Sequence, residues 1–371
     1  MDSNRIPFSP RSALDRFESY LPGLAIEQIK RQYGLKHVIK MASNENPLGP
    51  SKKGKSAYED AAERIFRYPE TRSVDLRQLI AQKHRLDLSQ VIVGAGSDEI
   101  IELLAKTFLT SEDDIVVSAS AFMQYRSAAY LMGARVVTVP MKDMKHDLNG
   151  MASAVTKRTK FVFIANPNNP TGTYNTRAEV DEFIAILPLH VVPVFDEAYF
   201  EYAQTSTEYP SISREYFKKR PMVVLRTFSK IFGLAGLRVG YGLAPDSMVA
   251  PMDKIRPPFN VSVPAQAAAA AAIFDEDHVR KSVEHNEIGK KFLADELASL
   301  SFNVVPSAGN FVLFNTQPWT GRFLFEQLIQ KGIITRCVDE YALPKYLRVT
   351  IGKMDEIKTL LKALREVIKS T

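Results

Sequence analysis

The sequence is poor in the residues that build disulfides and metal cages. Only one of its 371 residues is a cysteine, Cys337, so the chain cannot form an internal disulfide or a zinc cage made of cysteines. The six histidines stand at no spacing that is typical of metal ligands. The sequence therefore predicts no metal site, and we look for its chemistry in other residue types.

Long apolar runs and a strong excess of one charge are also missing. No apolar run approaches the length that crosses a membrane, and residues 1–11 lack the apolar stretch of a secretory signal. The net charge is +6, from 48 basic and 42 acidic residues, a modest excess that is compatible with small anionic ligands. Short basic runs such as Lys218–Arg220 carry no interleaved aromatics, which favours solvated surface over a nucleic-acid face. We therefore expect a cytoplasmic enzyme without membrane or nucleic-acid partners.

What the chain does contain is an alternation of strand and helix patterns. Short β-branched runs are candidates for buried strands, and helical patterns separate most of them. Such alternation is typical of an α/β fold with a mainly parallel sheet that helices cover on both faces. The strand candidates are residues 91–93, 115–117, 136–139, 161–165, 191–195 and 222–225.

The character of the chain changes after Pro257 and Pro258. Residues 265–272 are nearly all alanine, which predicts a tightly packed helix, and a charged helical pattern follows over 277–300. Later strand and helix patterns predict a small α+β domain of roughly one hundred residues. We expect an N-terminal arm at 1–30 that packs on the small domain, a large domain at 31–260 and the small domain at 261–371.

One lysine stands where a nucleophile is expected. Residues 222–225 lead to Ser229 and Lys230, and a glycine-rich loop and Arg238 follow. A lysine held at a strand end among small and apolar residues loses hydration, which lowers its pKa and frees its amine for Schiff-base chemistry. Ser229 and Arg238 supply the hydroxyl and the fixed cation that a phosphate requires. Taken alone, Lys230 is also compatible with a surface lysine on a loop.

A glycine turn after residues 91–93 opens a helix at Ser97. Free N–H groups and the helix dipole make such a helix start an anion site. The pattern is not a full dinucleotide-binding fingerprint, because Glu99 stands where a third glycine is expected. A plain strand-to-helix turn, with Ser97 as its cap, is the alternative.

Polar loops follow the strand candidates at one predicted edge of the sheet, where ligands of parallel sheets bind. Asp196 is placed to hold a pyridine nitrogen protonated, or else to cap a helix. Tyr199 and Phe122 suit contacts with an aromatic ligand or ordinary core packing, and Asn169 lies in a run of turn residues. The loops are residues 94–98, 120–125, 166–172, 196–199 and 227–230.

Together these motifs resemble the pyridoxal-phosphate (PLP) aminotransferases of fold type I, class II, and most of all the branch that acts on histidinol phosphate. The matching stretches cover nearly the whole chain in the order of the family. They are Asn44–Pro47, Arg67–Pro69, Gly96–Glu99, Asn168–Gly172, Asp196–Tyr199, Ser229–Tyr241 and Leu347–Gly352.

The resemblance implies a seven-stranded, mainly parallel sheet in the large domain and PLP as the cofactor. It implies that Lys230 forms a Schiff base with PLP and moves the substrate proton, while Asp196 pairs with the ring nitrogen. Tyr199 and Asn169 are implied to bind the 3′ oxygen, and Phe122 to stack on the ring. The implied phosphate contacts are the backbone N–H groups of Ser97 and Asp98, the side chains of Ser229 and Arg238, and Tyr68 reaching over from a second subunit. The family often has proline at the position of Ser120, so this departure would loosen the loop that carries Phe122.

For the substrate, the resemblance implies that Arg348 receives the anionic end, with Arg336, Tyr20 and Asn46 as further contacts. The implied reaction is transamination of L-histidinol phosphate with 2-oxoglutarate in L-histidine biosynthesis, by a homodimer with shared sites. An aromatic amino-acid aminotransferase and a PLP-dependent decarboxylase of amino-acid phosphates stay open as alternatives. An effector module of a transcription regulator is less favoured, because only about thirty residues precede the fold, too few for a helix-turn-helix domain.

Overall fold

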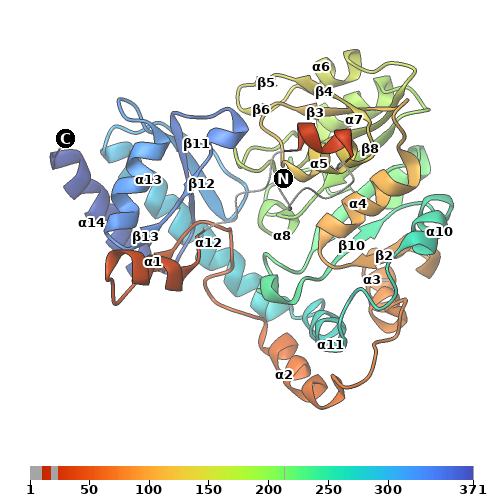
Figure 1. Ribbon diagram of the computed structural model, residues 1–371, viewed down its shortest axis with the longest axis horizontal. Helices are drawn as coiled ribbons and strands as arrows, with labels where there is room; N and C mark the ends of the chain where they lie inside the picture. Colours follow the sequence, from red (N-terminus) through yellow and green to blue (C-terminus); the bar gives the residue numbers. More distant parts are fainter. Residues whose placement is uncertain (1–10, 18–23, 213, 371) are drawn as a thin grey trace, which may run out of the picture.

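A seven-stranded sheet forms the centre of the larger part of the molecule (Figure 1) in the computed structural model, which describes residues 11–17, 24–212 and 214–370. The strand order is β2-β10-β9-β8-β7-β3-β4, and only β10 runs antiparallel to its neighbours. The predicted α/β fold with a mainly parallel sheet is therefore confirmed. The strands are β2 (Val91–Gly94), β3 (Asp114–Ser118), β4 (Arg135–Val139), β7 (Thr159–Ala165), β8 (Val192–Asp196), β9 (Val223–Thr227) and β10 (Gly240–Leu243).

Both faces of this sheet are buried, which explains why its strands are almost uniformly apolar. Val116 and Val162 point to one apolar cluster, and their chain neighbours Ile115 and Phe161 point to the other. The first cluster is covered by α3 (Val74–His84), α6 (Leu148–Ser153), α7 (Arg177–Ile186) and α11 (Val263–Ala272). The second is covered by α4 (Ser97–Phe108), α5 (Gln124–Leu131) and α10 (Asp246–Ile255).

A four-stranded antiparallel sheet organises the smaller part, as expected for an α+β domain. It packs on α12 (Glu276–Ser299), α13 (Gly321–Gln330) and α14 (Met354–Ser370). The N-terminal segment joins this part, because α1 (Ile26–Tyr33) packs near it and β1 (Ile39–Lys40) pairs with β13 (Ile333–Ile334). The strands of the four-stranded sheet are β11 (Val304–Val305), β12 (Phe311–Asn315), β14 (Arg336–Cys337) and β15 (Tyr346–Thr350).

The alanine-rich helix α11 belongs to the core of the large sheet. It packs on α2 (Lys52–Ala61), and Ala265 and Ala268 are fully buried in the first cluster. Helix α12 packs Val279 and Val283, near its start, against the first cluster of the large domain. Near its end it contributes Leu293 and Leu297 to the core of the small domain. We therefore propose a domain boundary along α12 in place of the one expected at residue 261.

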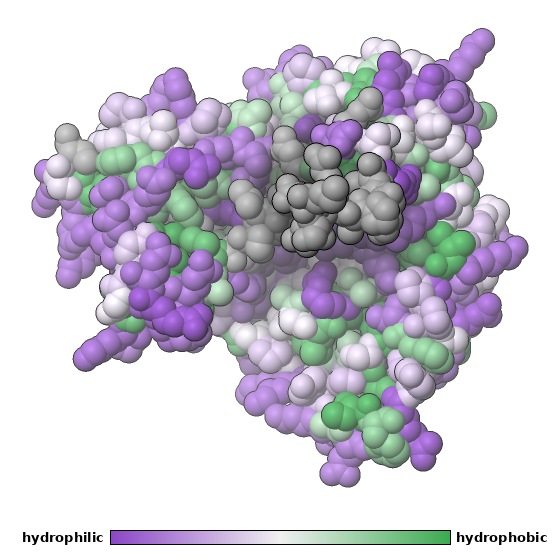
Figure 2. Space-filling model, in the orientation of Figure 1, coloured by the Kyte–Doolittle hydropathy of each residue, from purple (hydrophilic) through white to green (hydrophobic). Residues whose placement is uncertain are grey.

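Some large apolar side chains are exposed at the surface. Hydrophobic residues gather at the bottom of the view in Figure 2, over α2 and the chain that follows it. Ile65 and Phe66, which follow α2 in the sequence, have exposed side chains. In the described part of the chain, no helix is long and apolar enough to cross a membrane.

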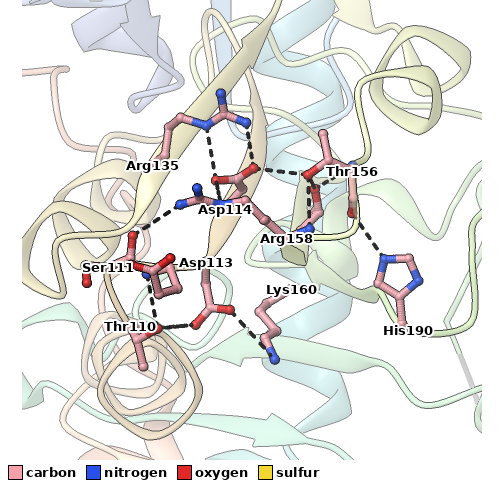
Figure 3. Close-up of polar contacts among 11 residues, drawn as sticks. Thr110, Ser111, Asp113, Asp114, Arg135, Thr156, Arg158, Lys160 and His190 are labelled. Carbon is pink, nitrogen blue, oxygen red and sulfur yellow. Dashed lines mark hydrogen bonds and ion pairs between the residues drawn. The ribbon is translucent and has the colours of Figure 1, made fainter.

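A polar cluster fixes the edge of the large sheet at the starts of its strands (Figure 3). Asp114, the first residue of β3, is fully buried and accepts hydrogen bonds of 2.6 and 3.1 Å from Arg135. Thr156 and Arg158 contact the same carboxylate, and the bond from Arg135 lowers the pKa of Asp114. Because Arg135, Thr156 and Arg158 all hold this carboxylate within the protein, we interpret the cluster as structural.

Candidate active site

A cavity of about 290 Å³ lies beyond the carboxyl ends of β7, β8 and β9. This is the edge at which the sequence placed its polar loops, and parallel sheets bind ligands there. The cavity brings together residues from both domains that are far apart in the sequence. The predicted site residues that line it are Ser97, Asp98, Phe122, Asn169, Asp196, Tyr199, Ser229, Lys230, Arg238, Arg336 and Arg348.

Lys230 reaches the cavity from the loop after β9. Its Nζ donates a hydrogen bond of 3.0 Å to the carbonyl oxygen of Ser43 and lies 5.8 Å from the centre of the Tyr199 ring. The amine thus stands between a backbone acceptor and an aromatic wall, inside a cavity large enough for a ring-shaped ligand. This geometry suits a lysine that bonds to a carbonyl carbon.

Asp196 ends β8 and is buried in the floor of the cavity. Its Oδ2 accepts a hydrogen bond of 2.7 Å from the hydroxyl of Tyr125, and its Oδ1 accepts one of 3.1 Å from the N–H of Ala198. Burial raises the pKa of Asp196 to about 6, although both bonds act to lower it. A cationic ring nitrogen beside this carboxylate would compensate for the lost hydration, so the residue fits a protonated pyridine.

The start of α4 forms a cradle with the shape of an anion site. Gly96 has a φ of +83°, and a Cβ there would lie 2.5 Å from Nη2 of Arg238. Arg238 lies 3.2 Å from Asp98 Oδ2 and 3.5 Å from Ser229 Oγ. Ser97, the first residue of the helix, adds its N–H to this hydroxyl and this cation. The cradle therefore fits a phosphate group, and the positive φ of Gly96 favours glycine at its turn.

Tyr199 and Asn169 are held by residues that reach across the cavity. The hydroxyl of Tyr199 accepts a hydrogen bond of 2.8 Å from Asn44 Nδ2, and burial raises the pKa of this tyrosine. Arg348 donates from Nη1 to Asn169 Oδ1 and from Nη2 to the carbonyl of Ala42. An arginine of the small domain thus touches a loop of the large domain inside the cavity.

The two arginines of the cavity are cross-strand neighbours. Arg336 on β14 stands directly opposite Arg348 on β15, and opposed residues of an antiparallel pair point to one face. Both guanidinium groups line the cavity, and Arg336 also forms an ion pair with Glu340. The pair supplies two fixed cations at the small-domain side of the site.

The loop with Phe122 is ordered by side-chain hydrogen bonds, although proline is absent there. The hydroxyl of Ser120 donates a bond of 2.8 Å to the carbonyl of Tyr341, and Asn168 Nδ2 donates one of 3.1 Å to the carbonyl of Ser120. Phe122 lines the cavity and packs edge-on against Tyr125, with ring centres 5.7 Å apart. The expected loosening by Ser120 is therefore offset by these bonds.

Two of the predicted site residues that the structure describes do not line this cavity. Asn46, which was expected to contact the substrate, instead donates to the carbonyl of Ile231 at 2.8 Å, because its amide is turned toward the loop behind Lys230. Tyr68 is 82% exposed and stacks on Phe259, with ring centres 4.7 Å apart. Tyr20 lies outside the described residues.

The sequence did not identify several residues that complete the site. Tyr125 stood in a singled-out loop, and Asn44 stood in a singled-out motif, but no pattern indicated that their side chains bond to Asp196 and Tyr199. Among the residues that the structure describes, no cluster of histidine, cysteine, aspartate or glutamate could hold a metal ion. The further lining residues are Ser43, Asn44, Glu45, Gln124, Tyr125, Ala165, Pro167, Ala198, Thr227, Ala235 and Tyr341.

Comparisons with known proteins agree with this geometry. The family model for aminotransferase class I and II matches residues 36–364. Histidinol-phosphate aminotransferase of Moorella thermoacetica is 44% identical over 96% of this chain and 92% of its own length. Histidinol-phosphate aminotransferase 2 of Carboxydothermus hydrogenoformans is 39% identical over 97% and 99%.

A solved structure extends the likeness to the whole fold. Histidinol-phosphate aminotransferase of Sinorhizobium meliloti, in complex with pyridoxal-5′-phosphate, has a TM-score of 0.89 and 28% sequence identity. The match covers 99% of each chain. The likeness therefore includes both domains.

Proposed function

We propose, because this chain belongs to the aminotransferase class I and II family, that it catalyses PLP-dependent transamination of L-histidinol phosphate with 2-oxoglutarate. The products are imidazole-acetol phosphate and L-glutamate, and the reaction is a step of L-histidine biosynthesis. The observation that carries the proposal is one cavity with Lys230 at its floor and the Arg336–Arg348 pair at its small-domain side. The names of the relatives supply the substrate class.

The residues that would hold the cofactor fit it chemically. When bound, PLP supplies a ring that takes up the electron pair left on the substrate carbon. Asp196 would hold the ring nitrogen protonated, because a buried carboxylate gains most from a cationic partner. Tyr199 and Asn169 would bind the 3′ oxygen, and Phe122 would pack against the ring. The phosphate is assigned to the backbone N–H groups of Ser97 and Asp98 and to the side chains of Ser229 and Arg238, which form the cradle at the start of α4.

Lys230 is the residue to which we assign proton transfer. Its amine can take the proton from the substrate carbon that bears the amino group and deliver it on the cofactor side. The amine lies in the cavity between the Ser43 carbonyl, to which it donates a hydrogen bond, and the Tyr199 ring. A group held in this way needs little reorganisation between the two positions.

The paired arginines suit substrates of two kinds. Histidinol phosphate carries a phosphate and no carboxylate, whereas 2-oxoglutarate carries carboxylates, and both use the site in turn. A guanidinium binds either oxyanion through two parallel N–H bonds, which a lysine cannot do. We assign the shared anion contact to Arg348 and a phosphate-selecting role to Arg336.

We further propose that the active unit is a homodimer with shared sites. Ile65, Phe66 and Tyr68 are exposed large side chains close together in the chain, and a second copy would bury them. In that dimer Tyr68 would reach the partner's cofactor phosphate. A cytoplasmic location is part of the same proposal, and the buried thiol of Cys337 suits a reducing compartment.

Initial rates on L-histidinol phosphate and L-phenylalanine, side by side with 2-oxoglutarate as acceptor, test the substrate. A higher kcat/KM for histidinol phosphate supports the proposal, and a higher value for phenylalanine would replace it with an aromatic aminotransferase. A half-reaction with L-glutamate tests the reaction class. Formation of 2-oxoglutarate without release of carbon dioxide supports transamination, and carbon dioxide release would favour a decarboxylase.

A further inference from the structure

The carbonyl oxygen of Ile231, the residue after Lys230, accepts hydrogen bonds from two side chains. Asn46 Nδ2 donates at 2.8 Å and His278 Nε2 donates at 3.0 Å. Ile231 is fully buried and Asn46 is nearly so, which shields both bonds from water. A carbonyl oxygen only accepts, so Nε2 of His278 carries the hydrogen, and the two donors use the two lone pairs of one oxygen.

The orientation of Asn46 is fixed by further bonds. Its Oδ1 accepts from the N–H of Leu48 at 3.0 Å, and its Nδ2 also donates to Ser282 Oγ at 2.9 Å. Turning the amide over would break the bonds to Ile231 and Leu48, because a carbonyl oxygen only accepts and a backbone N–H only donates. Neither Asn46 nor His278 lines the cavity, so their effect on the chemistry has to pass through the backbone of the Lys230 loop.

The rest of this loop is held by backbone contacts with residues 46–51. The N–H of Ser51 donates to the carbonyl of Phe232 at 3.0 Å. At Gly233, which has a φ of +68°, a Cβ would lie 2.1 Å from the carbonyl oxygen of Gly49. The hydroxyl of Ser51 in turn donates to Asp275, the cap of α12, at 2.6 Å. Successive peptides after Lys230 are therefore fixed from one side.

Both donors stand on segments that continue into the small domain. His278 lies in the first turn of α12, whose last turns carry Leu293 and Leu297 in the small core. Asn46 follows β1, which pairs with β13 of the small domain. The Ile231–Phe232 peptide is thus bonded to two connections between the domains.

We propose that Asn46 and His278 are positioning residues that fix the Ile231–Phe232 peptide, one residue beyond Lys230, and thereby the direction in which the amine of Lys230 meets the substrate carbon. This inference rests on the proposed role of Lys230. It assigns to two residues outside the cavity a share in the rate of proton transfer and none in substrate binding. Misplacement of a reacting group by about 1 Å can cost on the order of a hundredfold in rate.

His278→Leu and His278→Gln separate positioning from mere stability, because leucine removes the donor and glutamine keeps one at a similar reach. His285, on the same helix, is a matched control, since its Nε2 bonds to the carbonyl of Gly352 at 2.9 Å, away from Lys230. We expect His278→Leu to lower kcat about ten- to a hundredfold with KM nearly unchanged. His278→Gln should recover most of this loss, and His285→Leu should leave kcat near the wild-type value at a comparable melting temperature.

A second readout uses the protein without cofactor. The rate at which acetic anhydride labels Lys230, followed by peptide mass spectrometry, should shift in His278→Leu and return in His278→Gln. Asn46→Asp, which loses the amide donor without a change of size, should shift both readouts in the same way and serves if the leucine variant does not fold.

Equal kcat and equal labelling in His278→Leu and His285→Leu would overturn the inference. A rise of KM at constant kcat would overturn it as well, because it would assign His278 to substrate binding. Failure of the proposed function is a separate result, since a wild-type protein in which borohydride traps no PLP on Lys230 would remove the premise itself.

Discussion

The hydroxyl of Tyr125 donates a hydrogen bond of 2.7 Å to Oδ2 of Asp196, at the floor of the cavity. Both residues are buried, and Tyr125 also stacks on Phe163, with ring centres 4.8 Å apart. The stacked tyrosine therefore holds the carboxylate of Asp196 in a fixed orientation. One hydroxyl does not replace water, however, and burial still raises the pKa of Asp196 to about 6.

This raised pKa makes the stability of the cofactor-free protein depend on pH. Between about pH 4 and 6, folded Asp196 keeps a proton that the unfolded chain has released, so its contribution is present at low pH and is lost as the pH rises. The loss should amount to about 1.4 kcal/mol per pH unit in this window. Asp196→Asn removes the titration. Urea unfolding of both proteins across the window should give a difference that falls with pH, and a constant difference would refute the assignment.

The two arginines should differ in their substrate dependence. Loss of one charge-assisted contact costs roughly 1.5–3 kcal/mol, about ten- to a hundredfold in kcat/KM. We expect Arg348→Ala to impair both half-reactions, and Arg336→Ala to impair histidinol phosphate more than phenylalanine. Arg365→Ala, at an exposed ion pair with Glu296, is the control. Equal losses on the two donors in Arg336→Ala would remove Arg336 as the phosphate-selecting residue.

Mixed subunits test whether Tyr68 serves the site of a partner. Tyr68→Ala and Lys230→Ala should each be strongly impaired, but a hybrid dimer has one site with both residues intact. Half of the dimers at random exchange are hybrids, so roughly a quarter of wild-type activity should return. Exchange is verified with differently tagged subunits. An absence of recovery despite exchange would assign Tyr68 to its own protomer or to no site.

The sequence predicted the large sheet well because its strands are buried on both faces. Runs such as residues 161–165 have no polar position, and the polar residues that follow them mark the ligand edge. For this reason Asp196, Asn169 and Lys230 could be placed in one cavity before any coordinates. The cradle at Ser97 was visible in the same way, from a glycine turn that opens a helix.

Features that depend on contacts through space were not predictable. Strand β10 contains Gly240 and Gly242, which have weak strand propensity, yet it pairs with both β2 and β9. Glycine lets the strand pass close to the start of α4, where a Cβ at Gly240 would lie 2.6 Å from the backbone nitrogen of Ser97. The bond from Tyr125 to Asp196 joins residues 71 positions apart. The amide nitrogen of Asn46 bonds to both Ile231 and Ser282. No local sequence pattern relates Asn46 to Ser282, which lies far along the chain.

Reduction of the PLP-loaded protein with borohydride tests the central claim most directly. Wild type should acquire a stable adduct that peptide mass spectrometry places on Lys230, because this amine is the one at the cavity floor. Lys230→Ala should acquire none, whereas Lys106→Ala, at an exposed ion pair, should behave as wild type. A covalent PLP adduct in Lys230→Ala, or one that maps to another lysine in the wild type, would contradict the account.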